Sequence, residues 1–319
     1  MLKRTLGRSG IEVAAVGMGC WAIGGPNYRD GQPTGWGDVD DEVSLRALAK
    51  ALELGATLFD TADGYGNGHS ERLLGKALAG RRDQAVIATK VGYTFKGDTR
   101  EMIGESGDPD YIRQACEASL TRLGTDYIDI YQFHLGRFEL GQAEPVRDVM
   151  EQLVAAGKIR WYGWSTDSPE RAALFAAGEH CTAIQQRFNI FEGNAETLAI
   201  CAKANLASIN RGPLAMGLLT GKYGPDTKMP ADDVRHRWNL QEGPQARNLA
   251  KLNDMRDVLT SDGRTLAQGA LCWLLARSEV TVPIPGFKTP EQVADNIGAA
   301  VRGPLSGDEM AQIDEILQQ

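Results

Sequence analysis

Histidine, cysteine and positive charge are all scarce in this chain of 319 residues. Four histidines are too few for the histidine-rich sites of most metallohydrolases, so we expect no metal site. The five cysteines are odd in number and form no Cys-x-x-Cys pair, which argues against a disulfide framework or a zinc knuckle. Most of them lie in apolar or helical patterns, which predicts small buried thiols.

Long apolar runs and an excess of basic residues are also missing. No stretch reaches the ~20 apolar residues of a membrane span, so we expect no membrane partner. The net charge of −8 argues against nucleic acid as a main partner, although it leaves room for a local basic pocket. The apolar octet 13–20 faintly resembles a signal peptide, but Glu12 and two glycines favour a cytoplasmic protein. The oligomeric state is left open.

Short apolar segments alternate with longer amphipathic ones along the chain. Eight segments are apolar on both faces, as parallel strands covered by helices are, and they span residues 15–18, 57–60, 85–90, 128–134, 160–164, 183–186, 206–210 and 280–284. Helices fit between them at 40–54, 70–78, 145–156, 195–204, 265–276 and 290–298, and two more begin after Asp108 and Ser168. This alternation predicts an α/β fold, a single (β/α)8 TIM barrel over residues 1–319.

Three further segments flank this pattern. Residues 3–5 and 12–13 lie on either side of two glycines and predict a short N-terminal hairpin. Stretches rich in glycine, proline and charge at 92–107 and 222–243 follow the third and seventh strands. We therefore expect two long loops over the C-terminal face, where barrel enzymes place their active sites.

Four polar residues follow three neighbouring strands. Asp60 ends the second strand and Tyr65 follows it on a loop, while Lys90 ends the third and His134 the fourth. Each residue alone has an ordinary structural explanation, such as a turn cap or a core histidine. Together they converge at one rim of a barrel, where a lysine paired with Asp60 favours tyrosinate and lowers the tyrosine pKa from about 10.

Two other motifs are rejected. Residues 17–22 match G-x-G-x-x-A, but two glycines and a proline follow where a dinucleotide-binding fingerprint needs a helix. Residues 163–167 resemble a nucleophile elbow, but Asp167 occupies the last glycine position and no Ser-Asp-His order follows.

The ordered set of motifs resembles the aldo-keto reductase superfamily, whose tetrad is Asp, Tyr, Lys and His on a (β/α)8 barrel. The matching segments run nearly end to end: 16–21, 59–66, 68–71, 162–165, Gln185 with Asn189, 213–222, and 284–286 with Asn296. The last two blocks are similar to the bacterial branch that includes general oxidoreductases and potassium-channel β subunits.

The resemblance implies roles for the four residues. Tyr65 is expected to act as the general acid that protonates a carbonyl oxygen, and Lys90, paired with Asp60, is expected to lower the Tyr65 pKa. His134 is expected to orient the carbonyl, and the substrate is expected to contact Tyr65, His134 and Trp21. The implied reaction is hydride exchange between NADP(H) and an aldehyde, ketone or sugar, in either direction, with NAD(H) not excluded.

The resemblance also implies a cofactor site, formed by Trp21, Asp60, Ser165, Thr166, Gln185, Arg211, Pro213, Leu214, Gly217, Leu218, Lys222, Gly286, Phe287, Lys288, Gln292, Asp295 and Asn296. Arg211 stands where many relatives have a tyrosine that stacks on the nicotinamide, so it either stacks there or pairs with a carboxylate. Lys288 lies before a helix that starts at residue 290, with Thr289 as N-cap and Gln292 as capping-box partner. Such a site suits a 2′-phosphate.

Two functions from different classes are compatible with these residues. The first is an NADP(H)-dependent carbonyl reductase or alcohol dehydrogenase. The second is an NADPH-binding regulatory subunit with slow redox chemistry, as in channel-associated relatives. The complete tetrad favours the enzyme.

Overall fold

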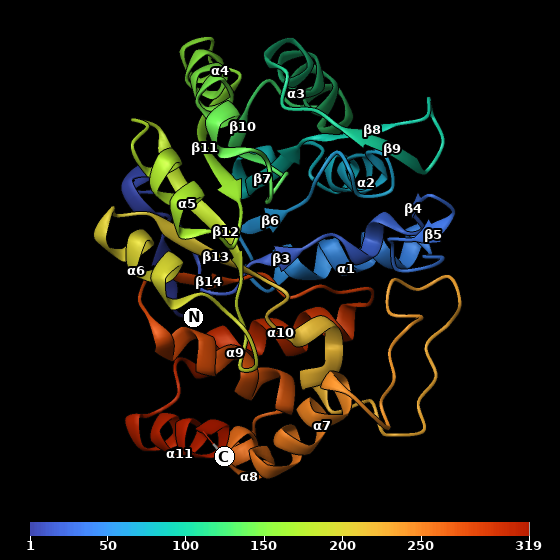
Figure 1. The fold of residues 1–319 in the computed structure, drawn as a ribbon, viewed down its shortest axis with the longest axis vertical. Coiled ribbons are helices and arrows are strands. Elements are labelled where there is room, and N and C mark those ends of the chain that lie inside the picture. The colour runs from blue at the N-terminus through green and yellow to red at the C-terminus, as the bar shows by residue number, and fades with distance from the viewer. Residues whose placement is uncertain (319) are drawn as a thin grey trace.

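An eight-stranded parallel sheet forms the centre of the computed structural model, which describes residues 1–318 (Figure 1). In chain order the strands are β3 (Met18–Gly19), β6 (Leu58–Asp60), β7 (Val86–Val91), β10 (Ile128–Phe133), β11 (Ile159–Ser165), β12 (Cys181–Arg187), β13 (Ala207–Arg211) and β14 (Thr281–Pro283), and they pair in that order. The amides of Gly17 and Gly19 donate to the carbonyls of Pro283 and Pro285, each at 2.9 Å, and so join the first strand to the last. The predicted barrel fold is confirmed.

Helices follow the strands and cover the outside of the sheet (Figure 1). They are α1 (Asp41–Glu53), α2 (His69–Ala77), α3 (Pro109–Leu123), α4 (Ala143–Ala155), α5 (Pro169–Ala176), α6 (Ala195–Lys203), α9 (Leu266–Arg277) and α10 (Pro290–Arg302). The expected caps are present, because the Asp108 carboxylate accepts the amides of Asp110 and Tyr111 and Pro109 occupies the first turn. No helix within residues 1–318 is long and apolar enough to cross a membrane.

Three helices were not predicted: α7 (Pro244–Asp254), α8 (Arg256–Thr260) and α11 (Gly307–Gln318). They pack against one another, and α8 packs against α9 (Figure 1). A signal for α11 was present, because Glu309 accepts the Ser306 amide at 2.8 Å while the Ser306 hydroxyl accepts the Glu309 amide at 3.3 Å. The first strand is also shorter than predicted, because the amide of Ala15 bonds to Leu2 in the N-terminal segment.

The segment 92–107 was predicted to be a long loop. In the structure it contains two strands, β8 (Tyr93–Phe95) and β9 (Glu101–Glu105). These strands join β4 (Tyr28–Arg29) and β5 (Gln32–Pro33) in a small sheet of order β5-β4-β9-β8. Its register pairs Tyr28 with Glu101, so the strands depend on partners about seventy residues away and no local pattern announces them. The segment 222–243 is largely irregular, as expected, and its Val234 amide bonds to the Gly35 carbonyl at 2.8 Å.

The predicted N-terminal hairpin is present as β1 (Lys3–Thr5) and β2 (Glu12–Ala14). Leu6, in the turn that joins these two strands, is fully buried. It belongs to a cluster with Leu58, Ile130 and Ile209 from the barrel strands. The hairpin therefore packs against side chains of the barrel interior. The five cysteines are all free and buried, as predicted.

Candidate active site

Lys90 brings Asp60 and Tyr65 together where β6 and β7 end. Its Nζ lies 2.5 Å from Asp60 Oδ1 and 3.1 Å from the Tyr65 hydroxyl, and it donates to the Thr61 carbonyl at 2.8 Å. All three ammonium hydrogens can therefore be used, and the side chain is fully buried. Three oxygen atoms hold the ammonium in one position, and its bond to the Tyr65 hydroxyl in turn positions the phenol.

Two amides hold the other oxygen of Asp60. The Nε2 atoms of Gln132 and Gln185 lie 3.1 Å and 2.7 Å from Asp60 Oδ2. Gln185, expected at the cofactor carboxamide, is buried and gives this donor to Asp60. One cation and two amides thus orient the carboxylate.

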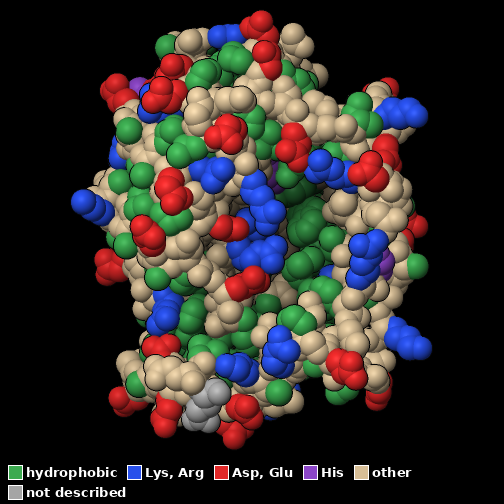
Figure 2. Space-filling model, viewed as in Figure 1, with side chains coloured by type: hydrophobic (Ala, Val, Ile, Leu, Met, Phe, Trp, Pro, Cys, Tyr) green, Lys and Arg blue, Asp and Glu red, His purple; other side chains and the backbone are tan. Residues whose placement is uncertain are grey.

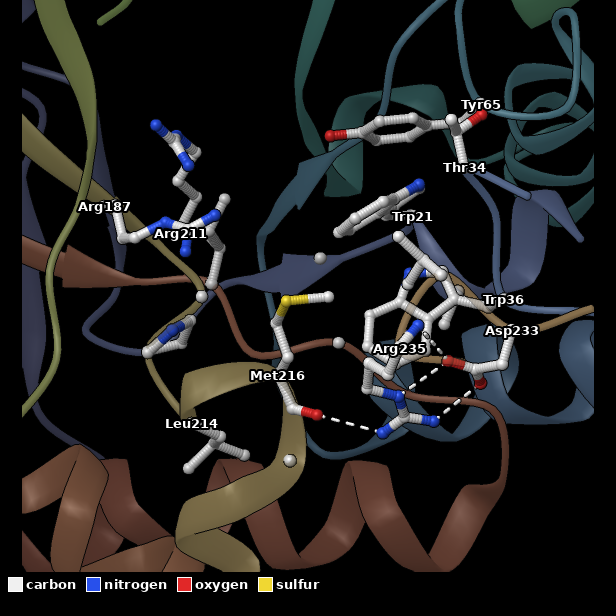
Figure 3. Close-up of a pocket in the computed structure, with 18 of the residues that line it drawn as sticks. Trp21, Thr34, Trp36, Tyr65, Arg187, Arg211, Leu214, Met216, Asp233 and Arg235 are labelled. Carbon is white, nitrogen blue, oxygen red and sulfur yellow. Dashed lines mark hydrogen bonds and ion pairs between the residues drawn. The ribbon is translucent and has the colours of Figure 1, made fainter. Parts of the chain in front are cut away.

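Aromatic rings surround the Tyr65 hydroxyl. Trp21 stacks on Tyr65 with 6.1 Å between ring centroids, and His134 meets Tyr65 edge-on at 5.8 Å. Tyr93 approaches His134 at 5.0 Å. Figure 3 shows the Tyr65 hydroxyl directed into the cavity above the ring of Trp21. The walls of this end of the cavity are therefore largely apolar.

Burial changes the proton affinities of these groups. Burial raises the pKa of Tyr65 above its ordinary value, although Lys90 acts to lower it. The expected net lowering is thus wrong for this structure, because removal of solvent outweighs the ammonium. Burial lowers the Lys90 pKa, but Asp60 and Tyr65 more than offset this, so it is raised overall. The phenol and the ammonium are both protonated at neutral pH.

His134 is neutral at physiological pH. Burial, followed by the charges of Lys90 and Arg211, lowers the pKa of His134 well below its ordinary value. Its Nδ1 is buried and finds no hydrogen-bond partner among residues 1–318. A neutral imidazole beside Tyr65 can donate a hydrogen bond to a bound molecule or accept one from it.

A single cavity of about 1710 Å³ connects this centre with the rest of the expected cofactor site. The expected residues that line it are Trp21, Asp60, Tyr65, His134, Ser165, Arg211, Pro213, Leu214, Gly217, Lys222, Gly286, Phe287, Lys288, Gln292, Asp295 and Asn296. Four others, namely the buried Lys90, Gln185, Thr166 and Leu218, do not line it. Gln185 lies beneath the wall, the Thr166 hydroxyl donates to Gly136 at 3.0 Å, and Leu218 packs against Leu240 and Leu249.

The far end of the cavity contains residues that the sequence did not single out. Arg235 forms a two-point pair with Asp233, with Nε and Nη2 at 2.8 Å and 2.7 Å from its oxygens, and its guanidinium lies 4.5 Å from the Trp36 ring (Figure 3). Lys288 Nζ donates to the Trp36 carbonyl at 2.7 Å. The contacts of Trp36 with Arg235 and Lys288 join positions about 200 to 250 residues apart, so no sequence spacing could have revealed them.

Two expectations for the cofactor site are refined. Arg211 Nη2 lies 2.5 Å from Asp167, so the carboxylate pair is present. Thr289 caps α10 as expected, but the Gln292 side chain accepts the amide of Lys288 at 2.7 Å. Gln292 therefore bonds one residue before the N-cap.

A parallel barrel with a lysine, carboxylate, phenol and imidazole at its C-terminal rim defines a class of oxidoreductases. The sequence pattern of the Aldo/keto reductase family matches residues 15–318. The chain is 33% identical over 316 residues to aldo-keto reductase YhdN of Bacillus subtilis, covering 97% of this chain and 92% of the relative. The chain belongs to the aldo/keto reductase family.

Solved structures agree with this assignment. The glycerol dehydrogenase AKR11B4 of Gluconobacter oxydans superposes with a TM-score of 0.85 and 31% identity, covering 99% of this chain and 94% of the other. An aldo-keto reductase of Klebsiella pneumoniae in complex with NADPH superposes with a TM-score of 0.72 and 28% identity, covering 99% and 96%. The whole fold is thus shared with members of the family.

Proposed function

We propose that this protein transfers hydride between NADP(H) and the carbonyl or alcohol group of a small substrate, with Tyr65 as general acid or base. The observation that carries the proposal is the position of Lys90 Nζ, which lies 2.5 Å from Asp60 and 3.1 Å from the Tyr65 hydroxyl. A protonated phenol that contacts a buried ammonium therefore lines a large cavity, which supports its role as the acid.

The residues of the cavity fit a dinucleotide phosphate. Ser165, Pro213, Lys222 and Lys288 all line the cavity. The Ser165 hydroxyl lies 3.5 Å from Gln185, the residue that donates to Asp60. Lys288 directly precedes the N-terminus of α10, where backbone amides and the helix dipole favour an anion. The cavity thus offers hydroxyl and apolar contacts for the nicotinamide and positive charge for the phosphates. The Klebsiella relative, in complex with NADPH, supports the same choice of cofactor.

This chain supplies position and a proton. When bound, the reduced nicotinamide supplies the hydride. As the carbonyl oxygen gains charge, the Tyr65 hydroxyl donates its proton to that oxygen, and the Lys90 ammonium stabilises the resulting tyrosinate. His134 donates a hydrogen bond that orients the carbonyl, and the ring of Trp21 excludes water from the reacting atoms. In the reverse direction Tyr65 accepts the alcohol proton.

Tyr65→Phe tests the proposal. Loss of the hydroxyl should lower kcat by ~10²–10⁴, the usual contribution of general acid catalysis. The tyrosine ring remains, so the dissociation constant for NADPH, measured by fluorescence titration, should stay close to that of the original protein. Undiminished turnover in this variant would exclude Tyr65 as the acid.

A screen of aldehydes, ketones and sugars with NADPH and NADH, in both directions, identifies the preferred substrate and cofactor. Rapid turnover of one compound supports the enzyme. Tight NADPH binding without turnover of any carbonyl compound would support the regulatory alternative instead.

A further inference from the structure

Two arginines stand side by side at the ends of neighbouring strands. Arg187 is the last residue of β12 and Arg211 the last residue of β13, and they are direct partners in the parallel register. Paired residues on adjacent parallel strands direct their side chains to the same face of a sheet. Both line the large cavity, and Figure 3 shows their side chains together on one side of it.

Only a small part of their hydrogen-bonding capacity is used. The side chain of Arg187 donates to Glu192 at 3.3 Å, and that of Arg211 donates to Asp167 at 2.5 Å; these are their side-chain bonds within residues 1–318. Glu192 and Asp167 are about half exposed, with side-chain exposures of 47% and 50%. Exposed pairs of this kind are weak, so they do not satisfy two adjacent guanidinium groups with five donors each.

Asp167 organises the pair. Its Oδ1 accepts the backbone amide of Arg187 at 2.6 Å while its Oδ2 accepts Nη2 of Arg211. One carboxylate thus positions both the backbone at the end of β12 and the guanidinium of Arg211 at the end of β13. The remaining donors of both side chains are left for a bound molecule.

The pair lies within electrostatic reach of the reaction centre. Figure 3 shows Arg187 and Arg211 on the side of the cavity toward which the Tyr65 hydroxyl points. After the larger effects of burial and Lys90, Arg211 also acts to lower the pKa values of both Tyr65 and His134. In the space-filling view, lysine and arginine side chains gather beside the hollow on this face (Figure 2).

We infer that Arg187 and Arg211 form an anion subsite, and that the preferred substrate carries a carboxylate or a phosphate monoester a few bonds from its carbonyl group. This inference rests on the proposed function. Two guanidinium groups with free donors match the oxygens of such an anion through charge-assisted hydrogen bonds. The aromatic walls around Tyr65 hold the carbonyl end, and the arginines hold the charged end.

Matched substrate pairs test the subsite. The values of kcat/KM are measured with NADPH for 4-oxobutanoate against butanal, and for glyceraldehyde 3-phosphate against glyceraldehyde. For at least one pair, the original protein should prefer the anionic compound about tenfold or more, as a charge-assisted hydrogen bond provides. Arg187→Gln should lower that preference about tenfold. Because a ratio is compared, effects common to both compounds cancel.

Arg137→Gln is the matched control. Arg137 lines the same cavity, is exposed, and makes no side-chain hydrogen bond within the described part of the chain. Its loss removes one positive charge near the mouth without touching the pair, so the preference should change less than about twofold at physiological salt. An equal loss in both variants would show a general field of positive charge and would overturn the subsite.

The cofactor pyrophosphate is the competing anion. If it occupies the pair, Arg187→Gln weakens NADPH binding in a fluorescence titration and leaves the substrate preference unchanged, which overturns the inference. Turnover of butanal and glyceraldehyde without preference for the anionic partners also overturns it and leaves the proposed function intact. If the original protein reduces no carbonyl compound in the wider screen, the proposed function itself fails.

Discussion

At the scale of single residues, one buried ammonium organises the candidate centre. Lys90 is completely buried and reaches Asp60, Thr61 and Tyr65 at once. Burial of a charge is tolerated only where such partners replace water. The same lysine therefore contributes to both the stability of the barrel and the electrostatics of the phenol.

Lys90→Met should lower the free energy of unfolding by about 3–5 kcal/mol, because it leaves the buried carboxylate of Asp60 without its cation. Urea unfolding monitored by circular dichroism measures the change. Lys222→Met is the control, since Lys222 is exposed and should change stability by less than about 0.5 kcal/mol. Equal stability of the two variants would contradict a structural role for the Lys90 charge.

His134 makes a specific contribution to the pH dependence of stability. The pKa of His134 is well below 6.5 in the folded protein, so the unfolded chain binds the extra proton below about pH 6.5. Protonation therefore favours unfolding as the pH falls through this window. In His134→Gln, the slope of unfolding free energy against pH between about 4.5 and 6 should be smaller by up to about 1.4 kcal/mol per pH unit. Parallel pH curves for the two proteins would show that His134 does not titrate differently on folding.

At the scale of elements, the N-terminal hairpin closes one end of the barrel. β1 and β2 carry Leu6 into the cluster formed by interior residues of the strands. The Thr182 hydroxyl at the start of β12 donates to the Leu6 carbonyl at 2.5 Å. The hairpin is thus held by both apolar packing and a buried hydrogen bond.

Leu6→Ala should lower the free energy of unfolding by about 2–5 kcal/mol, because it leaves a cavity among barrel side chains that cannot collapse freely. Denaturant unfolding measures this loss. Ile11→Ala provides a comparison, because Ile11 is only partly buried against the same cluster and should cost less. A loss at Leu6 no greater than that at Ile11 would contradict the packing role of the hairpin.

At the scale of the whole molecule, distant segments meet at the far end of the cavity. Lys288, which precedes the N-cap of α10, bonds to Trp36, and Trp36 contacts Arg235 in the segment 222–243. Burial lowers the Lys288 pKa, with Arg235 adding to the effect and Asp233 opposing it. Three parts of the chain thus surround the Lys288 ammonium.

Lys288→Met should weaken NADPH binding about tenfold and NADH binding less than about twofold, because only NADPH carries the extra phosphate. Fluorescence titration with each nucleotide at low and moderate salt measures both constants, and the NADPH difference should shrink as salt rises. Equal weakening of the two nucleotides would place Lys288 away from the 2′-phosphate.

Much of the fold was predictable because it follows from local patterns. Eight segments that are apolar on both faces, with helices between them, predicted the barrel. Asp108 and Thr289 marked helix starts, because their side chains accept backbone amides of the first turn. The positions of Asp60, Tyr65, Lys90 and His134 relative to these strands predicted that they lie near one another. Parallel strands in sequence order leave little choice about which ends are neighbours.

Local sequence patterns were enough to define the barrel and the set of polar groups at its rim. The tertiary structure alone decided the net rise in the Tyr65 pKa, because that balance depends on how completely rings from other segments exclude water. It also decided the register that sets Arg187 beside Arg211 and the contact of Trp36 with Arg235. Such contacts join residues far apart in the chain, and their energies depend on burial and distance, which local sequence patterns do not specify.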